Sequence, residues 1–178
     1  VISAEASCSD LALVVIGRTA GEDKDNYAGE GSYFLTATEE KMLALVCAAF
    51  SRVAVILNVG NIIDMKFVDK YEPQAVMYVW QGGIEGGHGV ADVLMGRVAP
   101  SGHLTDTIAY DIEDYPSTMN FGNETKSFYQ EDIYVGYRYF ETVAKDRVMY
   151  PFGYGLSYTV FAQEVTDKVQ TGDEISLT

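Results

Sequence analysis

The 178-residue sequence has few of the residues that build metal sites and disulfide frameworks. It has two cysteines, and Cys47 lies on the apolar face of a helical pattern, which favours a buried thiol over a disulfide with Cys8. The two histidines, His88 and His103, lie far from both cysteines and predict no zinc site. We therefore expect neither a metal nor another cofactor.

Basic residues are also scarce. The chain has 12 Lys and Arg against 26 Asp and Glu, so its formal net charge is -14. Binding to nucleic acid or to an anionic membrane surface depends on Lys and Arg, so this balance argues against both partners. No apolar run approaches the roughly 20 residues that cross a bilayer. We interpret the excess negative charge as a feature that keeps the protein in solution.

What the chain does contain is an alternation of short apolar runs and helical patterns. The apolar runs end in glycine, asparagine or tryptophan, as buried parallel strands do, and Thr36 with Glu39 fits a capping box at a helix start. This order predicts an α/β fold, a three-layer α/β/α sandwich with a mostly parallel sheet. The predicted strands are residues 11–17, 53–59 and 75–80, and the predicted helices lie within residues 36–50, 62–71 and 81–96.

The pattern changes from Leu104 onward, where the sequence becomes aromatic and rich in turns. It contains most of the 13 tyrosines and predicts a long irregular segment that wraps the sheet through its rings. Residues 163–178 alternate like a linker or the entry to a further β domain. The first residues, "VISAEASCSDLA", read as a helix without the strand expected before it, as in a piece of a longer protein. A sheet edge left open in this way favours association between copies.

Functional groups of parallel sheets collect in loops at the carboxyl ends of strands. Three polar loops begin at such ends, near Gly17, Asn58 and Gln81. The glycines of "GGIEGGHGVAD" lack the spacing and the position of a dinucleotide loop, and a tight helix–sheet turn is favoured there. The serine of "GLSYT" follows no parallel strand, which argues against a Ser/His/Asp hydrolase, and "DKDN" lacks the spacing of a calcium loop.

The loop after the first strand is acidic, with the sequence "GRTAGEDKDNYAGEG". Glu22 follows a buried strand directly, and such a loop can carry a carboxyl group towards a neighbouring surface. The residues alone leave two interpretations open, a solvated acidic loop or a general acid/base. Glu30, in the same loop, is the lower-ranked catalytic candidate, and Glu85 comes next, although its helix-start position favours a structural role.

Five segments in order resemble one known family. They are "VVIGRTAGEDKDN…GSYFLT", "VAVILNVGNIIDM", "WQGGIEGGHGVADVLMGRVAPSGHLTDTIA", "DIYVGYRYFET" and "YPFGYGLSYTVF". Together, over residues 8–162, they resemble the α/β-sandwich domain of family 3 glycoside hydrolases of the β-glucosidase type. The resemblance assigns residues 1–162 to this domain and residues 163–178 to a linker or the start of a fibronectin-III-like domain.

The resemblance implies a site shared between two domains. In the family a (β/α)8 barrel, absent from this chain, supplies an aspartate nucleophile, and the sandwich supplies a general acid/base glutamate. The motif G-R-x-x-G-E-G-x-D-R places that glutamate on Glu22; Asp23 stands where the family has glycine and Asn26 where it has arginine. The implied activity is retaining hydrolysis of a β-linked glucoside in the parent protein, with this chain alone inactive.

Three neighbouring residues, Arg18, Asp25 and Tyr27, are expected to border the substrate. The alternative function is a non-catalytic carbohydrate-binding or structural domain, in which Glu22 is inert and the aromatic second half supplies stacking surfaces. The presence of a barrel with an intact aspartate in the full-length protein would distinguish the two.

Overall fold

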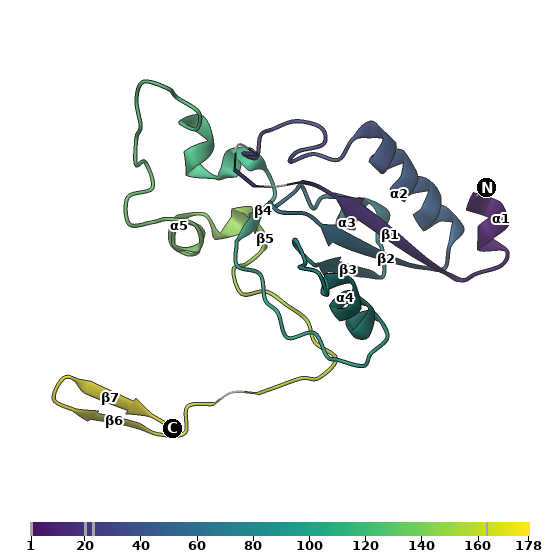
Figure 1. Ribbon diagram of the computed structural model, residues 1–178. Helices are drawn as coiled ribbons and strands as arrows, with labels where there is room; N and C mark the ends of the chain where they lie inside the picture. The colour runs from purple at the N-terminus through teal and green to yellow at the C-terminus, as the bar shows by residue number, and fades with distance from the viewer. Residues whose placement is uncertain (1, 20, 23, 163) are drawn as a thin grey trace.

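The computed structural model describes residues 2–19, 21–22, 24–162 and 164–178 of the chain. Its centre is a sheet of three parallel strands, β1 (Leu11–Gly17), β2 (Arg52–Asn58) and β3 (Ala75–Tyr78), in the order β1-β2-β3 (Figure 1). The α/β fold with a parallel sheet, predicted from the apolar runs, is confirmed. Each strand is a short and largely apolar run, rich in Val, Leu and Ile in β1 and β2, which suits a sheet interior.

The helix between β1 and β2 begins at the capping box that the sequence predicts. Helix α2 (Ala37–Ala49) starts after Thr36, whose hydroxyl accepts the backbone N–H of Glu39 at 3.2 Å. In return the backbone N–H of Thr36 donates to the Glu39 carboxylate at 2.8 Å. This is the predicted capping box, and it satisfies N–H groups that a helix start leaves without partners.

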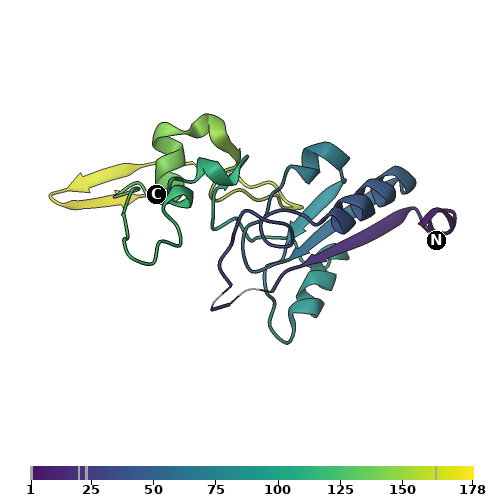
Figure 2. The ribbon, with the colours of Figure 1, turned by 90° about the horizontal axis from the view of Figure 1, so that it is seen from above.

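The remaining helices of the sheet region are short. Helix α1 (Ile2–Ala6) precedes β1, and α3 (Phe67–Tyr71) joins β2 to β3. Helix α4 (Gly86–Leu94) follows the glycine-rich turn after β3 and lies across the sheet from α2 (Figures 1 and 2). The chain leaves α4 through Gly96, whose φ of 69° is a conformation that glycine adopts without strain.

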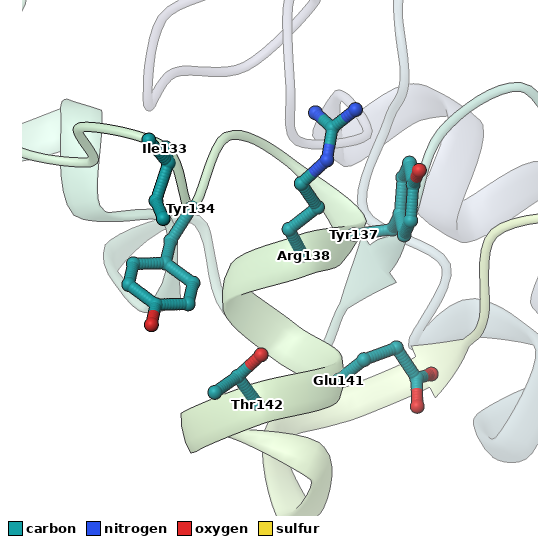
Figure 3. Close-up of a pocket in the computed structure, with 6 residues that line it drawn as sticks. All are labelled: Ile133, Tyr134, Tyr137, Arg138, Glu141 and Thr142. Atoms are coloured by element: carbon teal, nitrogen blue, oxygen red, sulfur yellow. The ribbon is translucent and has the colours of Figure 1, made fainter. Parts of the chain in front are cut away.

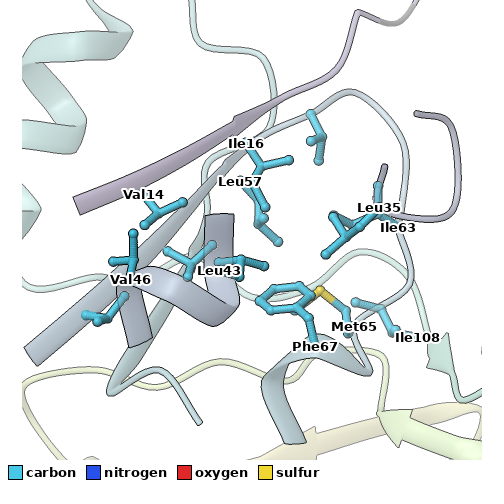
Figure 4. Packing of buried hydrophobic residues seen from close by; sticks show 13 residues of the cluster. Val14, Ile16, Leu35, Leu43, Val46, Leu57, Ile63, Met65, Phe67 and Ile108 are labelled. Carbon is cyan, nitrogen blue, oxygen red and sulfur yellow. The ribbon is translucent and has the colours of Figure 1, made fainter. Parts of the chain in front are cut away.

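The main core lies between the sheet and helices α2 and α3. Val14 of β1 pairs in register with Val55 of β2, and both belong to the same buried cluster as Leu43 of α2, which is fully buried. Figure 4 shows Val14 of β1 beside Leu43 and Val46 of α2. Burying these side chains supplies most of the driving force for folding this region. The cluster consists of Val14, Ile16, Leu35, Leu43, Val46, Val53, Val55, Leu57, Val59, Ile63, Met65, Phe67 and Ile108.

The opposite face of β1 is open. Leu11, Leu13 and Val15 alternate with the buried residues and remain 45%, 52% and 59% exposed. Strand β1 is also the edge of the three-stranded sheet, so one side of its backbone has no neighbouring strand among the described residues. The first strand therefore combines a face buried at Val14 and Ile16 with an apolar face that the described residues leave exposed.

The aromatic segment predicted as irregular contains short elements and a small core of its own. The ring of Tyr115 packs edge-on against Phe140, with centroids 5.3 Å apart, and its hydroxyl donates to the carbonyl of Thr107 at 2.8 Å. Phe140 is buried with Ala109 and Ala144. The elements are β4 (Ile108–Ala109), the 3₁₀ helices at Ile112–Asp114, Pro116–Met119 and Lys145–Arg147, α5 (Tyr137–Val143), and β5 (Val148–Tyr150), which pairs with β4.

The last residues form an antiparallel hairpin, β6 (Lys168–Thr171) and β7 (Glu174–Leu177), whose side chains are all exposed. It lies apart from the sheet, at the end of an extended segment (Figure 1). Across the described residues, none of the helices has the length and apolar character needed to span a bilayer.

Candidate active site

The loops that follow β1 and β2 start together at one edge of the sheet. Gly17 and Asn58 are paired at the ends of the two strands, and the backbone N–H of Arg18 donates to the carbonyl of Asn58 at 3.0 Å. Parallel strands bring their carboxyl ends to the same edge, which is where open α/β sheets place ligand sites. The loop with Glu22 and the loop "VGNIID" are therefore neighbours.

Glu22 lies in a turn and its side chain is exposed. The turn is closed by the backbone N–H of Lys24, which donates to the carbonyl of Gly21 at 3.2 Å. Gly21 has a φ of 145°, which L-residues with a side chain rarely adopt, so this position favours glycine. Asp23 lies outside the described residues. The turn thus presents the Glu22 carboxyl group outward from the edge of the sheet.

Side-chain amides connect the two loops. Nδ2 of Asn26 donates to the carbonyl of Ile62 at 2.7 Å, and Oδ1 of Asn26 accepts the hydroxyl of Ser32 at 2.9 Å. From the second loop, Nδ2 of Asn61 donates to the carbonyl of Lys24 at 3.1 Å. Asn26 occupies the motif position where the family has arginine, and in this chain its side chain binds the backbone carbonyl of Ile62. In the sequence, Asn26 stands out only as a departure from the motif and neither asparagine has a predicted role, because their partners are backbone atoms that no motif specifies.

Arg18 is held against the start of α2. Its guanidinium donates to both carboxylate oxygens of Glu39, at 2.5 and 2.6 Å, and the two side chains are only 12% and 19% exposed. Burial acts to raise the pKa of Glu39, but hydrogen bonds from Arg18 and Thr36 outweigh it and lower the pKa below its ordinary value. Nε of Arg18 is buried and has no hydrogen-bond partner among the described residues. Arg18 is therefore engaged in a bidentate ion pair inside the domain.

The other predicted residues occupy different positions. Glu30 is exposed, and its carboxylate accepts the backbone N–H of Ala37 at 3.3 Å, at the first residue of α2. Asp25 is exposed and has no side-chain partner among the described residues. Tyr27 is 61% exposed, with its ring against Gly29, where an added Cβ would lie 2.4 Å from a ring carbon. Glu85 precedes α4, where its carboxylate contacts the imidazole of His88.

A separate open hollow is lined by α5 and the residues before it (Figure 3). The guanidinium of Arg138 lies 5.1 Å from the ring centroid of Tyr137, a cation–π distance. None of the predicted catalytic or substrate-binding residues lines this hollow. The described residues also contain no group of three or more His, Cys, Asp or Glu side chains that could hold a metal ion. The hollow is lined by Ile133, Tyr134, Tyr137, Arg138, Glu141 and Thr142.

Comparison with known proteins places these features in a family. Residues 2–158 match the family described as glycosyl hydrolase family 3 C-terminal domain. The chain is 61% identical over 156 residues to a β-glucosidase of Ruminococcus albus. This match covers 88% of this chain and 16% of that protein. It is 43% identical over 190 residues to β-glucosidase A of Butyrivibrio fibrisolvens, covering 92% of this chain and 23% of that protein.

Solved structures of β-glucosidases also superimpose on this chain. A β-glucosidase from Paenibacillus barengoltzii superimposes with a TM-score of 0.92 at 55% identity, over 96% of this chain and 19% of that one. β-Glucosidase 3B from Thermotoga neapolitana, in complex with glucose, gives a TM-score of 0.86 at 38% identity, over 97% and 25%. The chain thus spans a quarter or less of the length of the proteins it resembles here.

Proposed function

The chain belongs to glycosyl hydrolase family 3, as its C-terminal domain, and we propose that Glu22 is the general acid/base of a retaining β-glucosidase formed with the rest of the parent protein. The observation that carries the proposal is the position of Glu22. It lies exposed in a turn at the carboxyl edge of the parallel sheet, in the segment that matches the family's G-R-x-x-G-E motif.

The mechanism assigns one carboxyl group to each domain. A barrel aspartate of the parent protein attacks the anomeric carbon while Glu22 protonates the departing glycosidic oxygen. Glu22, now ionised, then takes a proton from the water that displaces the aspartate and releases the sugar. A retaining site needs the two carboxyl groups about 5–5.5 Å apart, so the turn must bring Glu22 to the face of the barrel.

The contacts of the two candidate glutamates favour Glu22 over Glu30. The Glu30 carboxylate accepts the backbone N–H of Ala37 at the start of α2, a structural position that also benefits from the helix dipole. The Glu22 carboxylate has no partner among the described residues, which leaves both of its oxygens free for a substrate and a water molecule. A general acid/base needs this freedom because it exchanges protons with both.

The experiment is kinetic and uses the full-length parent protein. Glu22→Ala should lower kcat on an aryl β-glucoside by roughly 10²–10⁴-fold, because proton transfer in both half-reactions is lost. Added azide should restore turnover and yield a β-glucosyl azide, because this anion attacks the glycosyl-enzyme without needing a base. Glu30→Ala is the matched control and should keep kcat within about threefold and show no azide effect.

Near-normal activity of Glu22→Ala would exclude the proposed role. If Glu30→Ala were then the inactive variant and responded to azide, the acid/base role would belong to Glu30. If neither variant lost activity, the domain would be a structural or carbohydrate-contacting scaffold.

A further inference from the structure

The turn that carries Glu22 depends on a side chain from the neighbouring loop. Asn61 donates to the carbonyl of Lys24 at 3.1 Å, and Lys24 closes the turn through its N–H bond to Gly21. Glu22 lies between Gly21 and Lys24 in the sequence. A displacement of Lys24 therefore changes the direction in which the Glu22 side chain leaves the turn.

The Glu22 side chain is exposed and has no hydrogen-bond or ion-pair partner among the described residues, so no side-chain contact fixes its carboxylate. Its position is set by the backbone of the turn. That backbone is held on one side at Arg18, which bonds Asn58 and Glu39, and on the other side at Lys24, which Asn61 holds.

The second anchor is reinforced by a reciprocal bond. Asn26, two residues after Lys24, donates in the opposite direction, to the carbonyl of Ile62 in the loop of Asn61. Each loop thus supplies an asparagine that binds a backbone carbonyl of the other. A paired arrangement of this kind resists sliding of one loop past the other, because both bonds must break together.

We propose that Asn61 is a positioning residue for Glu22, which fixes the turn so that the carboxyl group meets the glycosidic oxygen across the domain junction. The inference rests on the proposed function, since Asn61 acts only through Glu22. Misplacing a catalytic group by about 1 Å can cost up to about 10²-fold in rate, so a single hydrogen bond to the turn has a measurable effect.

The test compares kcat and KM of full-length variants on an aryl β-glucoside. Asn61→Ala should lower kcat by about tenfold or more with KM within about twofold, because orientation in the transition state is lost while the sugar is bound elsewhere. Asn61→Asp keeps the size of the side chain but removes the N–H donor, so it should lower kcat as Asn61→Ala does. Asn123→Ala is the control: Asn123 also holds a loop, by accepting the N–H groups of Thr125 and Lys126, but that loop does not carry Glu22.

A double-mutant cycle separates positioning from a general structural role. In the Glu22→Ala background, with azide present, Asn61→Ala should cause no further loss, because the group it positions is gone. An equal fold-loss in both backgrounds would overturn the inference, and so would a normal kcat for both Asn61 variants. Those results leave Glu22 as the acid/base. A normal kcat for Glu22→Ala itself would instead overturn the proposed function.

Discussion

The Glu39 side chain takes part in two neighbouring contacts, the capping box of α2 and the ion pair with Arg18. Glu39 completes the capping box of α2 with Thr36 and also accepts both bonds from Arg18. Arg18 was predicted from the sequence to border the substrate, and the structure places its guanidinium inside the domain. Its role towards substrate remains a prediction, whereas its contact with α2 directly links the end of β1 to the helix start.

Glu39→Gln tests the strength of this link through pH. The pKa of Glu39 is lowered in the folded protein, so the ion pair stabilises the fold fully above the ordinary carboxyl pKa and loses that contribution as the pH falls through the lowered value. The variant should be less stable than the wild type by roughly 2 kcal/mol at neutral pH. The difference should shrink as the pH falls below about 4. Denaturant unfolding of the chain at a series of pH values measures it, and a pH-independent difference would contradict the account.

Among the secondary-structure elements, α2 carries most of the packing against the sheet. Leu43 points into the core and is fully buried, whereas Leu45, on the same helix, is 48% exposed. The predicted apolar face of this helix is confirmed: Leu43 and Val46 are buried, and Met42, Cys47 and Phe50 pack around them. The loop that carries Glu22 ends where this helix begins, so the helix anchors the loop.

Leu43→Ala should therefore lower the free energy of unfolding by about 2–5 kcal/mol, because it removes buried methyl groups and leaves a cavity. Leu45→Ala makes the same chemical change at an exposed position of the same helix and should cost less than about 1 kcal/mol. Equilibrium unfolding in urea compares the two. Similar losses for both leucines would mean that α2 does not pack on the sheet through this face.

The elements that could be predicted are those whose signals are local. The strand 11–17 ends at Gly17 and α2 begins with its capping box, so both features lie within a few residues. Helix α5 has seven residues, too few to display a helical period, and Phe140 is buried by partners from a distant segment. The contacts that shape the candidate site join residues 21 to 37 positions apart, Arg18 with Glu39, Asn26 with Ile62 and Asn61 with Lys24, and no local pattern reveals them.

Taken as a unit, the chain is one domain of a longer family 3 protein, and in the proposed function it supplies one of the two catalytic carboxyl groups. It spans 16% of the Ruminococcus albus relative and presents Glu22 at an exposed edge, together with an uncovered apolar face on β1. Both features suit a domain that works against other parts of a larger protein. Because the proposed nucleophile belongs to another domain, the acid/base role can only be measured in the full-length protein.

The most direct measurement compares two β-glucosides that differ only in their leaving group. Dinitrophenolate departs without protonation, whereas methanol needs a proton from a general acid. In the full-length protein, Glu22→Ala should lower kcat/KM slightly for the dinitrophenyl glucoside and severely for the methyl glucoside. An equal loss on both substrates would contradict the assignment of Glu22 as the acid.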